Sequence, residues 1–91
     1  RLDNQPNVAN AYFHLGRVYQ AWGKYEQAIS HYQQSLHLYE QLELETDVAD
    51  LWGVISNCYR GWCKYEQAID SRQNYLQIYQ RSDNQPNVAS A

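Results

Sequence analysis

Helix-breaking residues are scarce in this 91-residue chain, which contains only four Gly and two Pro. Long helices are therefore permitted along almost the whole sequence. No apolar run approaches the roughly 18 residues of a membrane-spanning helix, so we expect no membrane partner. Basic residues are also few. Seven Lys and Arg stand against ten Asp and Glu, and the net charge of −3 argues against a nucleic-acid-binding surface.

Cysteine and methionine are scarce as well. The only cysteines, Cys58 and Cys63, are five positions apart and fall on different faces of a helix, which argues against a disulfide. A reducing, cytoplasmic setting is the better expectation. Methionine is absent and the chain begins with Arg1, so we expect an excised fragment.

What the sequence does contain is an internal repeat. The segment WGKYEQAI at residues 22–29 returns as WCKYEQAI at residues 62–69, an offset of 40 residues. The opening segment, residues 1–11, returns at residues 81–91 with two changes, an offset of 80 residues. The predicted organisation is a first unit at residues 1–40, a second at 41–80, and the truncated start of a third at 81–91.

Apolar residues within each unit recur every three or four positions, which is the period of an α-helix with one buried face. On the first helix of unit 1 the expected core stripe consists of Val8, Ala11, Tyr12, Leu15, Tyr19 and Trp22. On the second helix of unit 2 it consists of Tyr65, Ala68, Ile69, Leu76 and Tyr79. No segment alternates as a strand does, so the chain is predicted to be all-α. The predicted helices span about 7–22, 25–42, 47–62 and 65–81.

The residue that ends the first helix differs between the units. Gly23 lies between the two halves of unit 1, where a residue in the left-handed conformation ends a helix. Cys63 takes its place in unit 2. A cysteine is strained in that conformation, unless Gly61 or a different turn type relieves it.

These features resemble the tetratricopeptide repeat family. The family spacing of a large residue, Leu-Gly, Tyr, Gly-x-Tyr, Ala and an aromatic is matched by Tyr12, Leu15-Gly16, Tyr19, Gly23-x-Tyr25, Ala28 and Tyr32. In unit 2, Ser56 replaces the glycine, Arg72 the aromatic, and Tyr75 a small residue. The 40-residue period is similar to the longer variety found in kinesin light chain and bacterial multi-repeat scaffolds. The resemblance implies antiparallel helix hairpins stacked as a right-handed α-solenoid that binds protein segments on its concave face.

The resemblance also implies that the first helix of each unit lines the concave groove. The positions outside the expected core stripes give the candidate groove residues: Asn10, Phe13, His14, Arg17, Asp50, Asn57 and Arg60. Phe13 beside the gap expected at Gly53 would form a pocket for an apolar side chain; alternatively, Phe13 only packs on the adjacent helix. Arg17, Asn57 and Arg60 are donors suited to a carboxylate or a backbone carbonyl, with an ordinary solvated or ion-paired role as the alternative.

Other chemistry finds little support in the sequence. His31 and His37 are six positions apart and face different sides of their helix, so we expect no metal site. Cys58 lies beside the core stripe with no His near it, and no phosphate-binding or hydrolase motif is present. The tyrosines that recur along the chain suit helix packing better than base stacking. We therefore expect no enzyme activity, no cofactor and no nucleic-acid partner.

The sequence thus predicts a non-catalytic protein–protein interaction scaffold that binds a peptide or partner helix in its groove. The alternative is a self-associating structural repeat that forms head-to-tail or segment-exchanged assemblies through its open ends. Two observations support the alternative. Repeat proteins of this kind need about three or more units for stability, and the two ends of the chain have nearly the same sequence.

Overall fold

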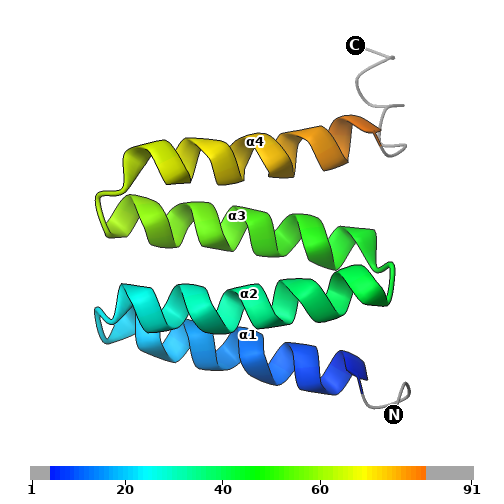
Figure 1. The fold of residues 1–91 in the computed structure, drawn as a ribbon, viewed down its shortest axis with the longest axis horizontal. Coiled ribbons are helices and arrows are strands. Elements are labelled where there is room, and N and C mark those ends of the chain that lie inside the picture. Colours follow the sequence, from blue (N-terminus) through cyan, green and yellow to red (C-terminus); the bar gives the residue numbers. More distant parts are fainter. Residues whose placement is uncertain (1–4, 82–91) are drawn as a thin grey trace.

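Four antiparallel helices make up residues 5–81, the part of the chain that the computed structural model describes (Figure 1). They are α1 (Gln5–Ala21), α2 (Tyr25–Gln41), α3 (Glu45–Gly61) and α4 (Tyr65–Arg81), and each is 17 residues long. Residues 5–81 contain no strand, so the predicted all-α class is confirmed. Of the expected start of a third unit at residues 81–91, the structure describes Arg81, the last residue of α4, and the rest lies outside the described residues.

The three links between helices share one geometry. Each contains a residue in the left-handed conformation: Gly23 (φ 82°), Glu43 (φ 59°) and Cys63 (φ 64°). In the first link, the backbone N–H of Lys24 donates to the carbonyl oxygen of Tyr19 at 2.8 Å, which satisfies a carbonyl that the end of α1 leaves free. Cys63 therefore keeps the turn of Gly23, and neither Gly61 nor another turn type relieves its strain.

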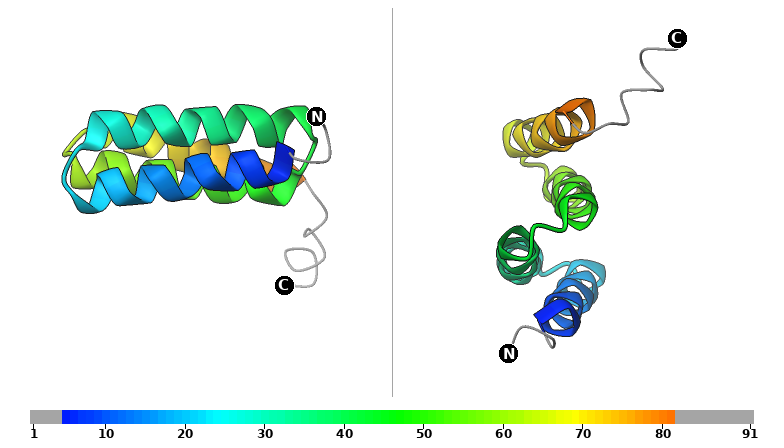
Figure 2. Two further views of the ribbon diagram at one scale, coloured as in Figure 1. Left: turned by 90° about the horizontal axis from the view of Figure 1, so that it is seen from below. Right: turned by 90° about the vertical axis from the view of Figure 1, so that its right-hand side faces the viewer.

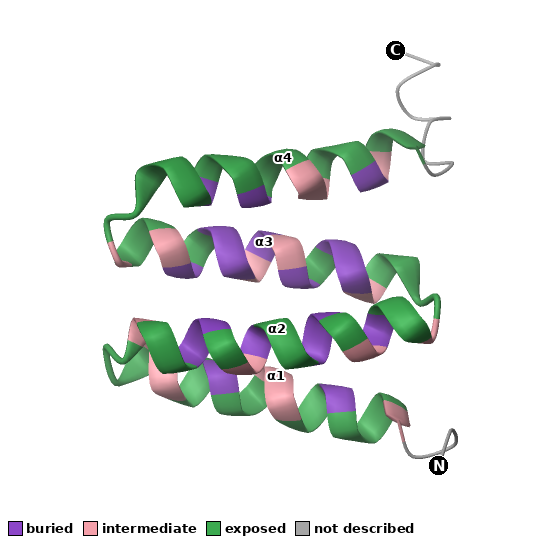
Figure 3. Cartoon of the chain, in the orientation of Figure 1, coloured by how far each residue is buried: buried purple, intermediate pink, exposed green. Residues whose placement is uncertain are grey.

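The helices form two layers, with α1 and α3 in one and α2 and α4 in the other (Figure 2). As a result, α2 packs against both α1 and α3, and α3 packs against both α2 and α4. Buried residues are concentrated on these two inner helices (Figure 3). The buried apolar residues of α2 are Ala28, Ile29, Tyr32, Leu36 and Tyr39, and those of α3 are Val48, Ala49, Leu51, Ile55 and Cys58.

The outer sides of α1 and α4 are not covered by any described helix. Seven residues of the expected core stripes on these helices are exposed: Val8, Ala11, Leu15, Trp22, Tyr65, Ile69 and Leu76. The prediction that they lie in the core is wrong. The periodicity identified an apolar side correctly on each helix, but in residues 5–81 no neighbour packs against that side of α1 or α4.

α1 and α2 approach each other closely where Gly16 meets Tyr32. The Tyr32 side chain is fully buried, and its hydroxyl donates to Oε1 of Gln20 at 2.6 Å. A Cβ atom at residue 16 would lie 2.6 Å from the Tyr32 ring and 3.1 Å from the backbone oxygen of Ala28. Glycine is therefore required at this position for space.

Large and small residues change places between the two hairpins. On α1 the large residue is Phe13, whose ring centroid lies 6.0 Å from that of Tyr32 on α2, and the α2 position Ser35 is small. On α3 the counterpart of Phe13 is Gly53, and on α4 the counterpart of Ser35 is Tyr75. The Tyr75 ring lies 3.4 Å from the position that a Cβ of Gly53 would take. Tyr75 therefore fills the gap expected at Gly53 and allows α3 and α4 to pack closely.

We expect Gly16→Ala to lower the free energy of unfolding by about 1–3 kcal/mol, because the added methyl group overlaps the buried Tyr32 ring. Urea denaturation followed by far-UV circular dichroism measures this change. Gly53→Ala is the matched control. Its Cβ would make an ordinary contact with Tyr75, so the higher helix propensity of alanine should raise stability by up to about 1 kcal/mol. Equal effects of the two substitutions would contradict the close approach at Gly16.

We expect Cys63→Gly to raise the free energy of unfolding by about 0.5–1 kcal/mol. The substitution removes the steric cost of a left-handed cysteine, and the greater backbone entropy of glycine in the unfolded chain offsets part of the gain. Thermal unfolding measures the effect. Gly23→Ala introduces the same strain in the first link and should lower stability by a similar amount. A destabilised Cys63→Gly variant would show that the left-handed turn is not strained.

Candidate protein-interaction surface

The predicted groove residues lie on α1 and α3, the two helices of one layer. A pocket of about 100 Å³ opens between these helices, and Tyr39 of α2 contributes to it. The residues that line it are Asn10, Phe13, Tyr39, Asp47, Asp50 and Leu51. The structure thus brings together three of the predicted residues: Asn10 and Phe13 from α1 and Asp50 from α3.

The pocket combines two aromatic rings with two carboxylates. The hydroxyl of Tyr79 donates to Oδ1 of Asp50 at 3.5 Å, which links α4 to the pocket wall. Burial, and next the negative charge of Asp47, raise the pKa of Tyr39 above its ordinary value. Tyr39 therefore stays a neutral phenol at physiological pH. Aromatic faces beside carboxylates form an environment that suits a cationic side chain with an apolar stem.

Phe13 is half-buried and has neighbours on two sides. Its ring lies 6.0 Å from Tyr32 of α2. Toward solvent, it lies 5.2 Å from the ring of His14, and the guanidinium carbon of Arg17 lies 5.8 Å from its centroid. Phe13 therefore packs on the adjacent helix and also lines the pocket. His14 and Arg17 are exposed beside it on α1.

Asn57 and Arg60 do not join this pocket. They line a separate hollow of about 270 Å³ between α3 and α4, together with Ser56, Tyr65, Ala68, Ile69 and Arg72. The seven predicted residues therefore do not form a single site. Asn10, Phe13 and Asp50 line the pocket between α1 and α3, whereas Asn57 and Arg60 lie further along α3 and line the hollow against α4.

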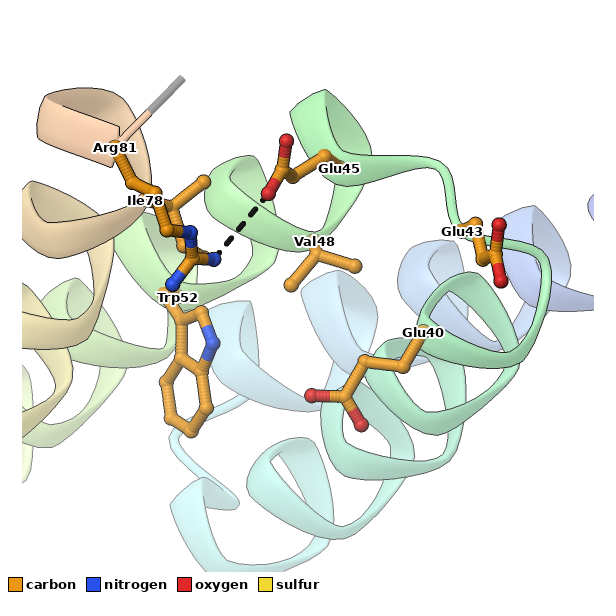
Figure 4. A pocket seen from close by; sticks show the side chains of 7 residues that line it. All are labelled: Glu40, Glu43, Glu45, Val48, Trp52, Ile78 and Arg81. Atoms are coloured by element: carbon orange, nitrogen blue, oxygen red, sulfur yellow. Dashed lines mark hydrogen bonds and ion pairs between the residues drawn. The ribbon is translucent and has the colours of Figure 1, made fainter.

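A larger hollow, of about 470 Å³, was not predicted from the sequence (Figure 4). It is lined by Glu40, Glu43, Glu45, Val48, Trp52, Ile78 and Arg81. Nη2 of Arg81 pairs with Oε2 of Glu45 at 3.2 Å, and because both side chains are well exposed this ion pair stabilises the fold only weakly. The sequence feature that could have indicated this hollow is the group of three glutamates around the link between α2 and α3. From the sequence alone, such a group is interpreted as solvated charge.

His31 has a packing role. The ring of His31 stacks on Tyr19 with centroids 5.0 Å apart, and its Nδ1 lies 2.9 Å from the backbone oxygen of Gln27.

Within residues 5–81, no group of three or more His, Cys, Asp or Glu side chains is arranged to hold a metal ion. Among the described helices, none combines the length and apolar character needed to cross a membrane.

The two cysteines are free thiols in different surroundings. Cys58 is fully buried, and its Sγ lies 4.0 Å from the backbone oxygen of Tyr25. Burial raises the pKa of Cys58 to about 11. Cys63 is exposed in its link, and the hydroxyl of Tyr65 donates to its Sγ at 3.7 Å. Cys58 therefore acts as a small apolar residue of the core.

Comparison with protein-family models identifies the first hairpin. Residues 1–41 match the model of the tetratricopeptide repeat, and this range contains α1 and α2. Residues 1–41 are thus a tetratricopeptide repeat, as the sequence resemblance implied, and α3 and α4 form a second hairpin 40 residues further on. Repeats of this family mediate protein–protein interactions and typically act as non-catalytic scaffolds. Comparison with curated proteins gives no match to the chain.

We expect the two thiols to differ sharply in reactivity. At about pH 8, a disulfide reagent such as DTNB should modify Cys63 rapidly and leave Cys58 unmodified until the chain is unfolded, because the raised pKa and burial of Cys58 suppress its thiolate. Counting released chromophore before and after adding guanidinium chloride measures this. The Cys63→Ser variant should release none before unfolding. Rapid modification of both thiols in the folded protein would show that the contact between α2 and α3 opens readily.

Proposed function

We propose that this chain is a protein-interaction module, built from units at residues 1–40 and 41–80, that binds a peptide segment along the layer of α1 and α3. The pocket between these helices is the observation that carries the proposal. It is the place where Asn10, Phe13 and Asp50 come together with Tyr39 and Asp47. Its small volume, about 100 Å³, suits one side chain rather than a whole ligand.

The chemistry of the pocket selects a basic side chain. The methylene stem of a lysine or arginine would pack against the rings of Phe13 and Tyr39, and its charged end would meet Asp47 and Asp50. Next to the pocket, the exposed guanidinium of Arg17 is a donor for a backbone carbonyl or a carboxylate of the same peptide. We therefore expect the preferred peptides to contain a basic residue flanked by an acidic residue or an exposed carbonyl.

Selection from a random peptide library, followed by calorimetry on the selected peptides, tests this function. We expect basic peptides to be enriched and their binding to weaken as salt is added. Phe13→Ala and Asp50→Asn should each reduce affinity by about tenfold, because they remove the packing surface and one charge from the same pocket. Arg17→Ala should have a smaller effect.

Asp70→Asn is the matched control. It makes the same chemical change as Asp50→Asn on an exposed side chain of α4, outside the pocket. Its affinity should equal that of the unmodified chain. Selected peptides that bind the Phe13→Ala and Asp50→Asn variants as tightly as the unmodified chain would overturn the proposal.

The alternative function, assembly of copies into a longer stack, uses different surfaces. It depends on the outer sides of α1 and α4 rather than on the pocket between α1 and α3, so binding and assembly can be tested separately.

A further inference from the structure

Apolar side chains are exposed along both outer faces of the molecule. The outer face of α1 and of the residue that follows it, called here the head face, consists of Val8, Leu15, Val18 and Trp22. The outer face of α4, called here the tail face, consists of Tyr65, Ile69 and Leu76. Contiguous apolar surface of this kind marks an interaction site more often than scattered single residues do.

The structure itself shows what covers a head face. Each position of the head face has a counterpart 40 residues later on α3, and α3 has α4 as its partner just as α1 has α2. Val18 is 62% exposed on α1, whereas its counterpart Cys58 is 0% exposed on α3. Leu15 is 45% exposed, whereas its counterpart Ile55 is 1% exposed. The additional neighbour of α3 is α2, so α2 is the helix that buries these positions.

The same comparison shows what covers a tail face. The tail-face residues have counterparts 40 residues earlier on α2. Ile69 is 57% exposed, whereas Ile29 is 6% exposed, and Leu76 is 50% exposed, whereas Leu36 is 7% exposed. The additional neighbour of α2 is α3. The head and tail faces are therefore the two halves of one interface, and the contact between α2 and α3 is the complete form of it.

We propose that copies of this chain stack head to tail, with α1 of one copy packed against α4 of the next as α3 packs against α2. At one end of the existing interface Trp62 stacks on Tyr25, with ring centroids 6.3 Å apart and planes 19° apart. The corresponding residues, Trp22 on the head face and Tyr65 on the tail face, are both exposed. In the stack, Trp22 of one copy lies on Tyr65 of its neighbour.

The substitutions between the units are compatible with this docking. Val18 stands in the place of Cys58 and keeps an apolar side chain at a fully buried position of the interface. Ala21 replaces Gly61, whose Cβ would lie 3.3 Å from the Tyr25 ring, so the exposed Tyr65 ring must shift by a few tenths of an ångström. The hollow of about 270 Å³ that borders Tyr65, Ile69 and Arg72 leaves space beside the incoming helix.

This interface joins two different surfaces, so it leaves a free head and a free tail after every addition. Such a heterologous contact gives open chains rather than a closed dimer. Sedimentation velocity over a wide range of protein concentrations measures it. We expect the average mass to rise steadily past that of a dimer as the concentration increases.

Two substitutions, one on each face, separate this arrangement from other modes of association. Val18→Glu and Ile69→Glu each place a carboxylate where the stack would bury it, and each should weaken association at least about a hundredfold. Each variant alone should therefore be monomeric. A mixture of the two still contains one intact tail face and one intact head face, so it should form a dimer and nothing larger.

Gln77→Glu is the matched control, because it adds the same charge to α4 at a position whose counterpart, His37, is exposed even beside a neighbouring helix. It should assemble like the unmodified chain, and circular dichroism should show all three variants equally helical. A chain that stays monomeric at every concentration would overturn the proposal. So would a single variant that still dimerises, since this would indicate pairing of like faces.

Discussion

The packing of α3 against α2 is the contact on which the rest of the structure depends. It is the most extensive contact between the two hairpins, and it buries residues that a single hairpin leaves in water. Cys58 and Ile55 on one side and Ile29 and Leu36 on the other are buried there because each inner helix has two neighbours. The outer helices have one neighbour each, and their apolar sides remain exposed. The same apolar side of a helix is thus buried where a neighbouring hairpin packs against it and exposed where none does.

The two hairpins share a backbone but not a set of contacts. Phe13 and Ser35 exchange sizes with Gly53 and Tyr75, so each pair fills a comparable space from opposite helices. Because Phe13 is on α1, its ring remains at the edge of the pocket that Asp50 and Asp47 complete from α3. In the second hairpin the large ring belongs to α4, and no equivalent aromatic projects from α3. The pocket therefore depends on a sequence difference between the two hairpins, namely Phe13 in the first and Gly53 in the second.

Periodicity and the repeat were sufficient to predict the all-α class and the family resemblance, because both follow from local spacing along the chain. They failed for Val8, Trp22 and Ile69, since a pattern shows which side of a helix is apolar and not whether a neighbour is present. The sequence correctly grouped Asn10, Phe13 and Asp50, because they lie on the sides of α1 and α3 that face each other. The assignment of residues to one side of each helix is sufficient to predict this. Asn57 and Arg60 are separate from them because they lie further along α3, where they border Ala68 and Arg72 of α4. The hollow around Trp52 depends on three elements meeting at one end, which no local pattern encodes.

The three links have the same length and a left-handed residue at the same position, whether they lie inside a unit or between units. The geometry of the links therefore does not show where one repeat ends and the next begins: α1 with α2 and α2 with α3 are joined in the same way. Duplication or loss of the 40-residue stretch that begins at the first link would join the same kinds of helix ends, but loss would set Phe13 against Tyr75 and duplication would set Gly53 against Ser35. The contacts inside each hairpin are preserved only where a whole hairpin is gained or lost, whereas an insertion of any other length would have to be accommodated within a link.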